Sequence, residues 1–576
     1  MLAESLKVTP FAMMSRPVAG VRNKSLILTL PGSVKGAKEN LEAVIDVLPH
    51  ACMQAAGADS RSLHAGGVKK LEAEAGVAAG GGRHDHHHHG GGHVVPKPHT
   101  SPEDRPMSND PSAGPTRRHR TSPYPMISVE EALAIIERET PSPRVEEVPV
   151  EEDLVGHVLA KDVYANEDVP AYRASIVDGY AVIAKETRPN TKGVFPVAYV
   201  SHAERSSISL PPLRPGKIVR VTTGAPLPPN ANAVVMVEDT IVKSTTIDGK
   251  EEATVEILTD DIKPGENVRE PGSDVAEGSK ILSKGDVLSA VGGEIGLLAS
   301  TGNTDVKVYT KPIVGVLSTG DELVRHDAER ALHEGEIRDS NRPALISCLM
   351  AWGIETVDLG IVSDSSKDLE TVLRDALRGT MDHPPVDVII TTGGVSMGER
   401  DLLKPTIERL LGGTIHFGRV AMKPGKPTTF ATIPRKTSNN PRKQVAIFAL
   451  PGNPASALVT MHLFVLPALH KLMGFSHPDG TEDRPSRGLP RVRAVLAHPI
   501  PRDPKRTEYH RAVVTASRDG RLRASSTGLE GVGQRSSRVA SMAKANALLV
   551  LPPGVESLPE GELVEALMMG QIVPGN

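Results

Sequence analysis

VDVIITTGGVSMGERDLLKPTIERLLG, residues 386–412, is an apolar run that ends in two glycines and continues into an amphipathic stretch. The near-continuous apolar run at 386–392 predicts a strand buried on both faces, and residues 399–412 predict a helix. Because a strand followed by a helix is the unit of parallel sheets, this stretch predicts an α/β fold.

The same alternation extends along the chain in both directions. Further strands are predicted at PIVGVLST (312–319), ETVDLGIV (355–362) and QVAIFAL (444–450). Helices are predicted at RPALISCLMAWG (342–353), SKDLETVLRDALRG (366–379) and PASALVTMHLFVLPALHKLMG (454–474). The pattern predicts a parallel sheet covered by helices on both faces.

The α/β domain is expected to span 311–485, between segments of β character. Residues 170–270 are rich in Val, Thr, Pro and Gly and contain short apolar bursts, which predicts a small β domain. Residues 486–576 return to short strands with turns and predict a second one. Upstream, a helix is predicted at 127–139, with Ser128 as its N-cap.

The N-terminal part differs from the rest in composition. Residues 61–122 are rich in Gly, His and Pro and poor in large apolar residues, which predicts a disordered linker. This segment contains a cluster of histidines, which we interpret as part of a solvated low-complexity tract, with transition-metal binding as the alternative. The cluster comprises His84, His86, His87, His88, His89 and His93. Before it, a strand at 25–32 and a helix at 33–51 are predicted, the strand without a neighbour to pair with.

Composition excludes several classes of protein. The chain has 66 Lys and Arg against 70 Asp and Glu, so nothing in the overall charge attracts nucleic acid or an anionic membrane. Aromatic residues make up only 3%, which argues against base stacking. Two distant cysteines, Cys52 and Cys348, favour a reducing compartment. Without an apolar run of membrane-spanning length or a secretory signal, we expect a cytoplasmic protein.

Three of the predicted strands end in glycine-containing turns, at 319–322, 393–399 and 451–454. In open α/β sheets, ligands bind at the carboxyl ends of the strands. Glycine lets backbone N–H groups approach an anion, and a following helix adds the positive end of its dipole. We therefore predict a site for a phosphate-bearing ligand, although any single turn has ordinary turn chemistry as its alternative.

The loop Lys423-Pro424-Gly425-Lys426-Pro427 adds positive charge. Its prolines stiffen the loop, so that it presents two ammonium groups on a rigid platform. Lysine is a point-charge ligand that suits a tetrahedral oxyanion. As exposed loop charges, both lysines are expected to contribute little to stability. The alternative is ordinary surface lysines.

Four carboxylates are predicted at the same edge of the sheet. Asp321 and Glu322 follow the first strand, Asp364 follows ETVDLGIV, and Asp401 follows the GGVSMGE turn. Carboxylates beside phosphate oxygens favour Mg²⁺. For Asp364 the alternative is capping of the next helix.

From about Ser122 to the C-terminus, a series of motifs resembles the molybdopterin molybdotransferases, the family of bacterial MoeA and the gephyrin E domain. The motifs stand in order at SIVDGYAV (175–182), VTTGAPLP (221–228), REPGSDV (269–275), STGDEL (318–323), IRDSNRP (337–343), TTGGVSMGERD (391–401), MKPGKPTTFA (422–431), LPGNPASALV (450–459), EYHRA (508–512) and STGLEGVGQRSSR (526–538). Residues 1–60 resemble the end of a gephyrin-type G domain. Its glycine-rich phosphate loop is not found there, so we expect a truncated two-domain protein that does not adenylylate the pterin.

The resemblance implies an L-shaped homodimer. It implies an elongated domain from residues 123–169 and 271–310, besides the inserted β, α/β and C-terminal β domains. The implied reaction converts adenylylated molybdopterin and molybdate into molybdenum cofactor and AMP, with Mg²⁺. A G-domain protein and apo-molybdoenzymes are the implied partners, and no nucleic acid or membrane insertion is expected.

The resemblance also implies a role for each site residue. Molybdate or a neighbouring phosphate would be held by Lys423, Lys426, Ser456, Arg511 and Ser537. The pterin phosphate or AMP would lie in the turns of Gly393, Gly394, Val395, Ser396 and Asn453. Mg²⁺ would be held by Asp364 and Asp401, with Glu322 ordering the metal shell or transferring a proton. Asp178 would reach across the dimer, with Thr223 nearby.

Two other functions remain open at this stage. One is a gephyrin-like scaffold that binds cytoplasmic loops of receptors. The other is a hydrolytic or transfer enzyme that acts on a different nucleotide-bearing substrate.

Overall fold

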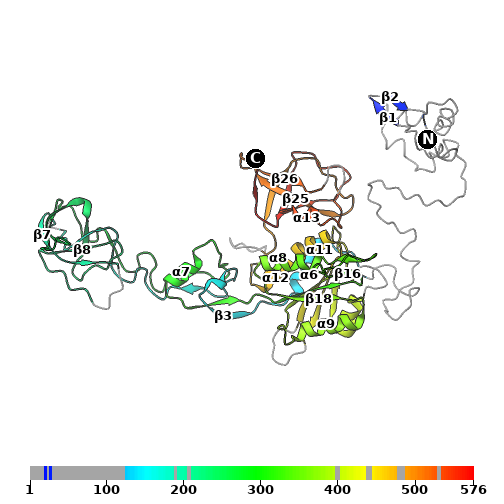
Figure 1. Cartoon of the computed structure of the whole chain (residues 1–576), viewed down its shortest axis with the longest axis horizontal. Coiled ribbons are helices and arrows are strands. Elements are labelled where there is room, and N and C mark those ends of the chain that lie inside the picture. The colour runs from blue at the N-terminus through cyan, green and yellow to red at the C-terminus, as the bar shows by residue number, and fades with distance from the viewer. Residues whose placement is uncertain are drawn as a thin grey trace. The chain divides into compact units, whose positions relative to one another are not determined.

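The computed structural model describes residues 19–22, 25–28, 48, 124–186, 191–203, 209–395, 402–435, 444–476, 487–528 and 534–575 (Figure 1). The chain divides into two compact units, Met1–His93 and Val94–Asn576. In the first unit, β1 (Ala19–Arg22) pairs antiparallel with β2 (Ser25–Leu28), so the expectation of an unpaired strand is wrong. The histidine cluster, and the helix predicted at 33–51 apart from Leu48, lie outside the described residues.

A six-stranded sheet forms the centre of the second unit. Its order is β18 (Thr356–Val362), β15 (Val314–Thr319), β19 (Val388–Thr392), β23 (Gln444–Leu450), β22 (Thr429–Pro434) and β20 (Thr414–Phe417). The first four strands are parallel, as predicted. β22 runs antiparallel to both of its neighbours, β23 and β20, and neither β22 nor β20 was predicted.

Helices cover both faces of this sheet. One face packs against α6 (Val129–Glu139), α8 (Asn341–Ala351), α11 (Pro454–Thr460) and α12 (Leu466–Leu472). The other packs against α9 (Ser366–Arg378), α10 (Leu403–Pro405) and the π-helical turn η7 (Thr406–Leu410). On β15, Val316 belongs to the first core and Leu317 to the second, because successive side chains of a strand point to opposite faces. The predicted α/β class is confirmed.

The sequence signals at the ends of two helices behave as predicted. Ser128 is the N-cap of α6, and its hydroxyl accepts a 3.0 Å hydrogen bond from the backbone N–H of Glu131. The predicted helix at 454–474 is continuous from α11 to α12 through the π-helical turn η8 (Met461–Val465). This run is long and apolar enough to cross a membrane, so the expectation that no apolar run has that length is wrong. However, 78% of its most apolar stretch is buried inside the protein, which is typical of a core helix.

Two further sheets have six and seven strands, and the remaining sheets among the described residues are two-stranded. The inserted β sheet has the order β10 (Thr240–Thr245), β11 (Glu252–Ile257), β7 (Gly193–Ser201), β8 (Ile218–Val221), β6 (Gly179–Val182), β9 (Ala233–Met236), and the 3-10 turn η6 (Val237–Asp239) links β9 to β10. Two-stranded sheets join segments on either side of it, namely β3 (Val145–Pro149) with β14 (Asp305–Tyr309), β4 (Val163–Tyr164) with β13 (Lys280–Leu282), and β5 (Ala174–Ser175) with β12 (Val268–Arg269). The 3-10 turn η5 (Glu152–Leu154) and α7 (Glu294–Ser300) pack in the core of this paired region.

The C-terminal sheet contains β21 (Met422–Lys423), β25 (Thr507–Ala516), β26 (Leu522–Ser526), β24 (Arg491–Leu496), β28 (Leu563–Met568), β27 (Ala547–Leu551) and β29 (Val573–Pro574), with the short helix α13 (Ala540–Ala543). One strand comes from far upstream, because β21 leaves the α/β domain and pairs in parallel with β25. This pairing places the lysine loop, which begins at Lys423, against the C-terminal domain. A further short pair, β16 (Leu323–Val324) with β17 (Ile337–Arg338), follows β15.

The core helix carries a buried histidine whose charge state links stability to pH. Burial lowers the pKa of His462 from its ordinary 6.5 to about 4. The folded state therefore binds fewer protons than the unfolded state, so the contribution of His462 is complete above pH 6.5 and is lost as the pH falls toward 4. Between pH 7 and pH 5 this loss amounts to about 2 kcal/mol.

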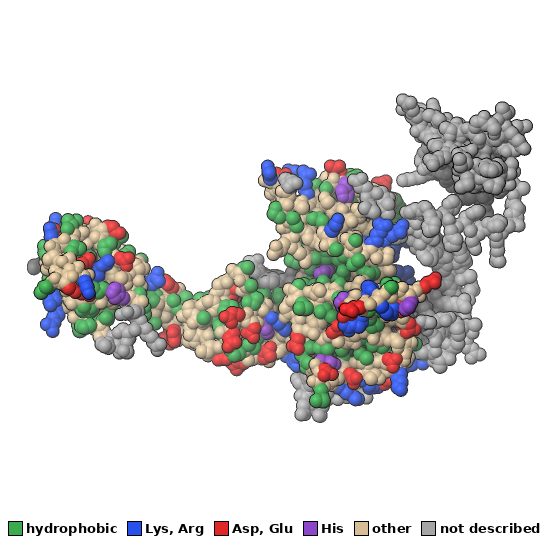
Figure 2. All heavy atoms as spheres, viewed as in Figure 1, with side chains coloured by type: hydrophobic (Ala, Val, Ile, Leu, Met, Phe, Trp, Pro, Cys, Tyr) green, Lys and Arg blue, Asp and Glu red, His purple; other side chains and the backbone are tan. Residues whose placement is uncertain are grey.

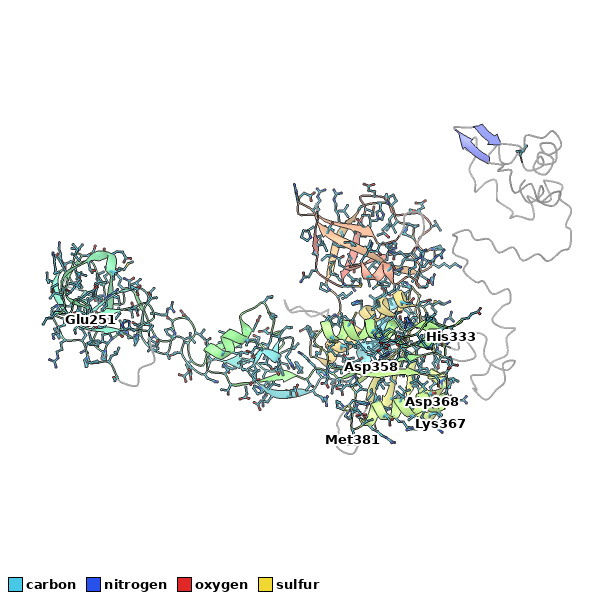
Figure 3. All side chains as sticks on the ribbon, in the orientation of Figure 1. Glu251, His333, Asp358, Lys367, Asp368 and Met381 are labelled. Carbon is cyan, nitrogen blue, oxygen red and sulfur yellow. The ribbon has the colours of Figure 1, made fainter. Side chains whose placement is uncertain are left out.

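We predict that His462→Phe makes the free energy of unfolding less dependent on pH in this range. The ring of His462 contacts Trp352 edge-on, with ring centroids 5.4 Å apart, and a phenyl ring retains this packing. Trp352 is the single tryptophan of the chain, so its fluorescence follows urea unfolding of this domain at pH 7 and pH 5. The pH-dependent loss should shrink by about 2 kcal/mol. His333→Gln, at an exposed histidine (Figure 3), is the control, and an unchanged pH dependence in His462→Phe would contradict the prediction.

Candidate functional site

The glycine-rich turns predicted from the sequence meet at the carboxyl edge of the α/β sheet. The backbone N–H of Gly393 donates to the carbonyl of Leu450 at 3.3 Å, and that of Gly320 donates to Val362 at 3.2 Å. A Cβ built on Gly452 would lie 3.7 Å from the Cα of Gly393, so these two turns are in contact. The structure therefore brings the three turns together.

Glycine is required at the centre of this edge. Gly393 has a φ of +86°, in the region that favours glycine, and a Cβ there would lie 2.4 Å from the carbonyl oxygen of Thr319. Gly394 has a φ of +61°, and its Cβ would meet the Thr319 hydroxyl at 3.0 Å. Two successive positive-φ glycines turn the backbone so that it can approach a ligand closely.

A small pocket joins the Gly394 turn to the start of α9. Its lining comprises Thr319, Ser363, Asp364, Ser365, Leu369, Gly394, Leu402 and Leu403. The N-cap of α9 is Ser365, whose hydroxyl accepts from the backbone N–H of Asp368. The capping alternative for Asp364 is therefore wrong. The backbone N–H of Asp364 donates to Asp321 Oδ1 at 3.0 Å, which ties two of the predicted carboxylates together.

The remaining residues of this edge are only partly described. Ser396 and Asp401 lie outside the described residues, whereas Val395 is buried. Glu322 is exposed, and its carboxylate lies beside Gly320, where a Cβ would come within 2.5 Å of Oε2. In the described part of the chain, no group of three or more His, Cys, Asp or Glu side chains is arranged to hold a metal ion.

A buried polar network supports the edge from below and was not predicted. The Ser318 hydroxyl donates to Asp339 at 3.1 Å, and Arg342 Nε donates to the same carboxylate at 2.9 Å. Arg342 also pairs with Asp358 on β18. Asp339 and Arg342 belong to the IRDSNRP motif, and the other two residues belong to predicted strands. Nothing in the sequence distinguishes the charged residues among them from ordinary surface charges.

The PGNP turn continues directly into α11. Asn453 is exposed and is the N-cap residue of this helix. The side-chain amide of Asn341, at the start of α8, donates to the carbonyl of Gly452 at 2.8 Å. The turn is thereby fixed between the GG turn and α11, whose first turn carries the buried Ser456.

The two lysines of the KPGKP loop have different environments. Lys423 is half-buried, and its ammonium donates at 3.0 Å to Glu508, a carboxylate on β25 of which only 4% is exposed. Lys426 is exposed. The expectation that both lysines contribute little to stability is thus wrong for Lys423, because its removal would leave a buried carboxylate without its cation.

Positive charge gathers around Lys426. Burial lowers its pKa, and so do the charges of Arg419 and Arg506. Arg419 precedes the loop, whereas Arg506 immediately precedes β25, so the cluster joins the α/β and C-terminal domains. Like charges held this close repel one another, and a bound anion would relieve the repulsion.

Arg511 adds a buried cation to the same region. Only 1% of this residue is exposed, and burial lowers the pKa of its guanidinium to about 10, against the opposing charge of Glu508. Among the described residues its guanidinium donates only to neutral oxygens, at 3.3 and 3.2 Å to the Ser541 hydroxyl and at 3.1 Å to the carbonyl of Arg535. A buried cation with such partners favours an anionic ligand.

The segment that carries Ser537 contacts the predicted oxyanion site through a backbone hydrogen bond. The N–H of Ala455 on α11 donates to the carbonyl of Ser536 at 3.0 Å, next to the exposed Ser537. A Cβ on Gly425 would lie 2.5 Å from Thr460 on the same helix. These contacts bring the lysine loop, α11 and the Ser537 segment together, next to β25. These four segments carry the predicted oxyanion residues, which are Lys423, Lys426, Ser456, Arg511 and Ser537.

Asp178 and Thr223 form a separate pair in the inserted β sheet. The backbone N–H of Thr223 donates to Asp178 Oδ1 at 2.8 Å, and its hydroxyl lies 3.4 Å from the same oxygen. Both residues are exposed. Within the described chain, the Asp178 side chain hydrogen-bonds to Thr223 and not to the α/β domain.

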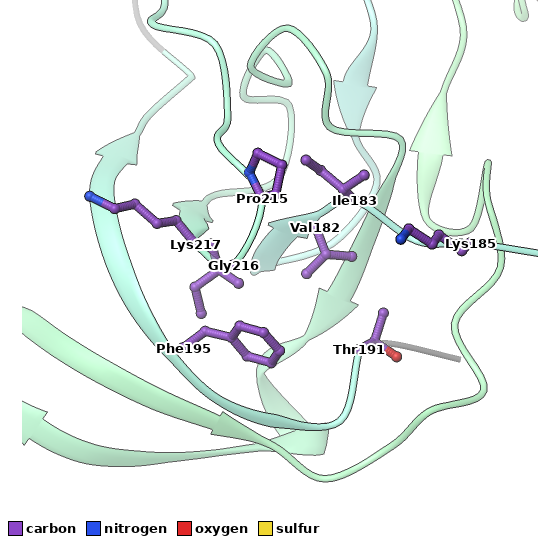
Figure 4. A pocket seen from close by; sticks show the side chains of 9 residues that line it. Val182, Ile183, Lys185, Thr191, Phe195, Pro215, Gly216 and Lys217 are labelled. Atoms are coloured by element: carbon purple, nitrogen blue, oxygen red, sulfur yellow. The ribbon is translucent and has the colours of Figure 1, made fainter. Parts of the chain in front are cut away.

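A second pocket lies in the inserted β sheet (Figure 4). Its lining comprises Val182, Ile183, Lys185, Thr191, Phe195, Pro215, Gly216, Lys217 and Ile218. None of the predicted site residues belongs to this lining. On the face seen in Figure 2, acidic and basic side chains are interspersed, so any attraction for an anion is local, as the near-neutral composition implied.

Comparisons with known proteins agree with this arrangement. Family models match the MoeA N-terminal region (domain I and II) at residues 127–302, a probable molybdopterin binding domain at 315–471, and the MoeA C-terminal region (domain IV) at 493–569. Gephyrin of Dictyostelium discoideum is 36% identical over 611 residues, covering 99% of this chain and 81% of the relative.

Two further relatives extend the comparison to bacteria and archaea. The molybdopterin molybdenumtransferase of Bacillus subtilis is 32% identical over 420 residues, covering 73% of this chain and 88% of the relative. The solved structure of the molybdopterin biosynthesis MoeA protein from Pyrococcus horikosii is 29% identical to this chain, with a TM-score of 0.59. The structural match covers 78% of this chain and 100% of the Pyrococcus chain. The resemblance found in the motifs is thus confirmed, and the chain belongs to the molybdopterin molybdenumtransferase family.

Proposed function

We propose that this chain inserts molybdate into adenylylated molybdopterin and releases molybdenum cofactor and AMP. It is a transferase of molybdenum cofactor synthesis, as its family and named relatives indicate. The specific reaction is supported by a group of cations, Lys426, Arg419, Arg506 and Arg511, which together with Lys423, Ser456 and Ser537 we call the oxyanion cluster. Lys426 lies among Arg419 and Arg506, and the guanidinium of the buried Arg511 has only neutral hydrogen-bond partners among the described residues.

The oxyanion cluster suits a tetrahedral dianion. Lys423 and Lys426 provide point charges, and Arg511 provides a planar donor set on the buried side. Ser456 and Ser537 add hydroxyl groups, which hydrogen-bond to an oxyanion whatever its protonation state. In the proposed function these five residues hold molybdate, or the phosphate next to it.

The glycine-rich edge suits the phosphates of the second substrate. The GG turn and the start of α11, which follows Asn453, lie at the same edge of the sheet. Ser396 belongs to this proposal through the sequence alone. Because the PGNP turn leads straight into α11, phosphate at the turn and oxyanion at Ser456 would be neighbours. Cationic groups there stabilise the charge that develops on the departing AMP.

Mg²⁺ is part of the proposal, and the residues present fit it. Mg²⁺ is commonly held by one or two carboxylates together with substrate phosphates, so a three-carboxylate cage is not needed. Asp364 lines the pocket beside Gly394 and is not a helix cap, and Asp321 holds its backbone. We assign Asp364 and Asp401 as ligands and Glu322 to ordering the metal shell or to proton transfer. When bound, the metal would neutralise charge on the phosphates.

The other parts of the proposal concern assembly. Asp178 and Thr223 hydrogen-bond to each other within the inserted β domain, and in this proposal they serve the site of a second chain in a homodimer. The domain ranges given above, a cytoplasmic location, a separate G-domain protein and apo-molybdoenzymes as partners belong to the same proposal. A receptor-binding scaffold is not proposed, because no contact among the described residues favours it.

Reconstitution tests the proposed function. Purified protein, adenylylated molybdopterin, molybdate and Mg²⁺ are expected to activate an apo-molybdoenzyme and to release AMP in equal amount. Omitting molybdate should abolish activation. Release of AMP that is the same with and without molybdate, and without activation, would indicate a different transferase or hydrolase and contradict the proposal.

A further inference from the structure

A chain of polar side chains leads inward from the lysine loop. Lys423 donates to Glu508 Oε2 at 3.0 Å, and His510 Nδ1 lies 3.1 Å from the other oxygen of the same carboxylate. His510 Nε2 lies 2.7 Å from the hydroxyl of Ser526 on β26. Glu508 and His510 stand two residues apart on β25, so both side chains point to the same face of the strand.

The protonation states along this chain are mutually consistent. Burial lowers the pKa of His510, and the hydrogen bond and charge of Glu508 offset this only in part. A neutral imidazole has one donor and one acceptor, so Nδ1–H donates to Glu508 and Nε2 accepts from Ser526. The Ser526 oxygen in turn accepts from the backbone N–H of Gly528 at 3.0 Å. Every group therefore has a partner of the right kind.

Burying the ionised carboxylate of Glu508 costs free energy, so its position calls for a functional reason. Burial by itself raises the pKa of Glu508, but the hydrogen bond from His510 and the charge of Lys423 outweigh it, so the pKa lies below its ordinary value. Apolar residues would usually stabilise such a position better than an ion pair does. The pair has a directional consequence, because one of the three N–H donors of Lys423 is engaged and 29% of its side chain stays exposed.

We infer that Glu508 is a positioning residue, which aims the Lys423 ammonium at the oxyanion while His510 and Ser526 hold the carboxylate in place. The inference rests on the proposed function, since it takes Lys423 as part of the molybdate site. The sequence contained the residues in EYHRA and STGLEG, but only Arg511 was assigned from them.

Two effects of Glu508 on molybdate have opposite signs. A carboxylate behind the lysine repels a dianion, so removing its charge should strengthen binding if only the field mattered. If instead the carboxylate fixes the lysine, loss of the contact should weaken binding. The direction in which molybdate affinity changes therefore identifies the role of Glu508. A residue with a purely structural role would leave this affinity unaltered.

Two substitutions separate charge from reach. Glu508→Gln keeps the shape and removes the charge, whereas Glu508→Asp keeps the charge but is too short to contact both Lys423 and His510. We expect both to raise the KM for molybdate about tenfold, as for one charge-assisted hydrogen bond, with kcat changed less than about threefold. AMP release and calorimetric titration with molybdate are the readouts. Glu565→Gln, which removes an exposed partner of Arg491 in the same sheet, is the matched control.

The possible results are distinct. A lower KM in Glu508→Gln with an unchanged KM in Glu508→Asp would show a field effect and overturn the inference, as would an unchanged KM in both. If circular dichroism shows both variants unfolded, Ser526→Ala decides, because it removes the donor to His510, together with the acceptor for Gly528 and Gln534, and should raise KM about threefold. Unchanged KM there overturns the inference. A wild-type protein that neither binds molybdate nor releases AMP would instead overturn the proposed function.

Discussion

Replacing Lys426 by alanine is expected to weaken molybdate binding roughly 100-fold and to leave the unfolding midpoint unchanged. The side chain is exposed and lies among the charges of Arg419 and Arg506, which lower its pKa together with burial. Truncating an exposed cation costs little stability, but a dianion loses one of its charge-assisted contacts. Calorimetric titration with molybdate measures the first effect and thermal melting the second.

Lys423→Ala is expected to differ from Lys426→Ala in one respect. It should also weaken molybdate binding, but it leaves Glu508 buried without its cation and should therefore lower the melting temperature. Lys250→Ala, at an exposed turn of the inserted β sheet, is the control for loss of a lysine as such. Wild-type molybdate affinity in Lys426→Ala would remove this residue from the oxyanion site.

The parallel part of the fold was predictable because its signal is local. Strands such as β19 are covered on both faces and therefore appear as unbroken apolar runs. The strands β22 and β20, which complete one side of the sheet, escaped prediction for the opposite reason. β22 contains two threonines among its apolar residues, and its burial depends on pairing with β23, which no local sequence pattern indicates. The π-helical turns η7 and η8 likewise lie in sequence that also suits an ordinary α-helix.

The candidate site was predictable where it depends on backbone conformation. The glycines of the GG turn stand where a Cβ would strike Thr319, so the residue type itself signals the geometry. The oxyanion cluster was only partly predictable, because its charges come together through the pairing of β21 with β25, 85 residues apart in sequence. Arg419 and Arg506 resemble surface arginines until that pairing is known. Glu508 illustrates the same limit, since its cation Lys423 lies 85 residues upstream in the sequence.

Asp364→Asn is expected to lower kcat for AMP release on the order of 100-fold and to raise the Mg²⁺ concentration needed for half-maximal rate. The substitution is isosteric. It leaves the backbone N–H that donates to Asp321, and the Ser365 cap of α9, in place. The loss should therefore come from the carboxylate charge alone, and circular dichroism should show an unaltered fold. Titrating Mg²⁺ at saturating molybdate and adenylylated molybdopterin measures the effect.

Asp375→Asn provides the control, because Asp375 is exposed on the same helix α9 and away from the pocket lining. It should show wild-type turnover and Mg²⁺ dependence. Asp321→Asn should fall between the two, since Asp321 acts through the backbone of Asp364 and its carboxamide still has an oxygen that accepts that hydrogen bond. If Asp364→Asn keeps both the wild-type rate and the wild-type Mg²⁺ requirement, its carboxylate does not hold the metal, and the pocket beside Gly394 binds phosphate through N–H groups alone.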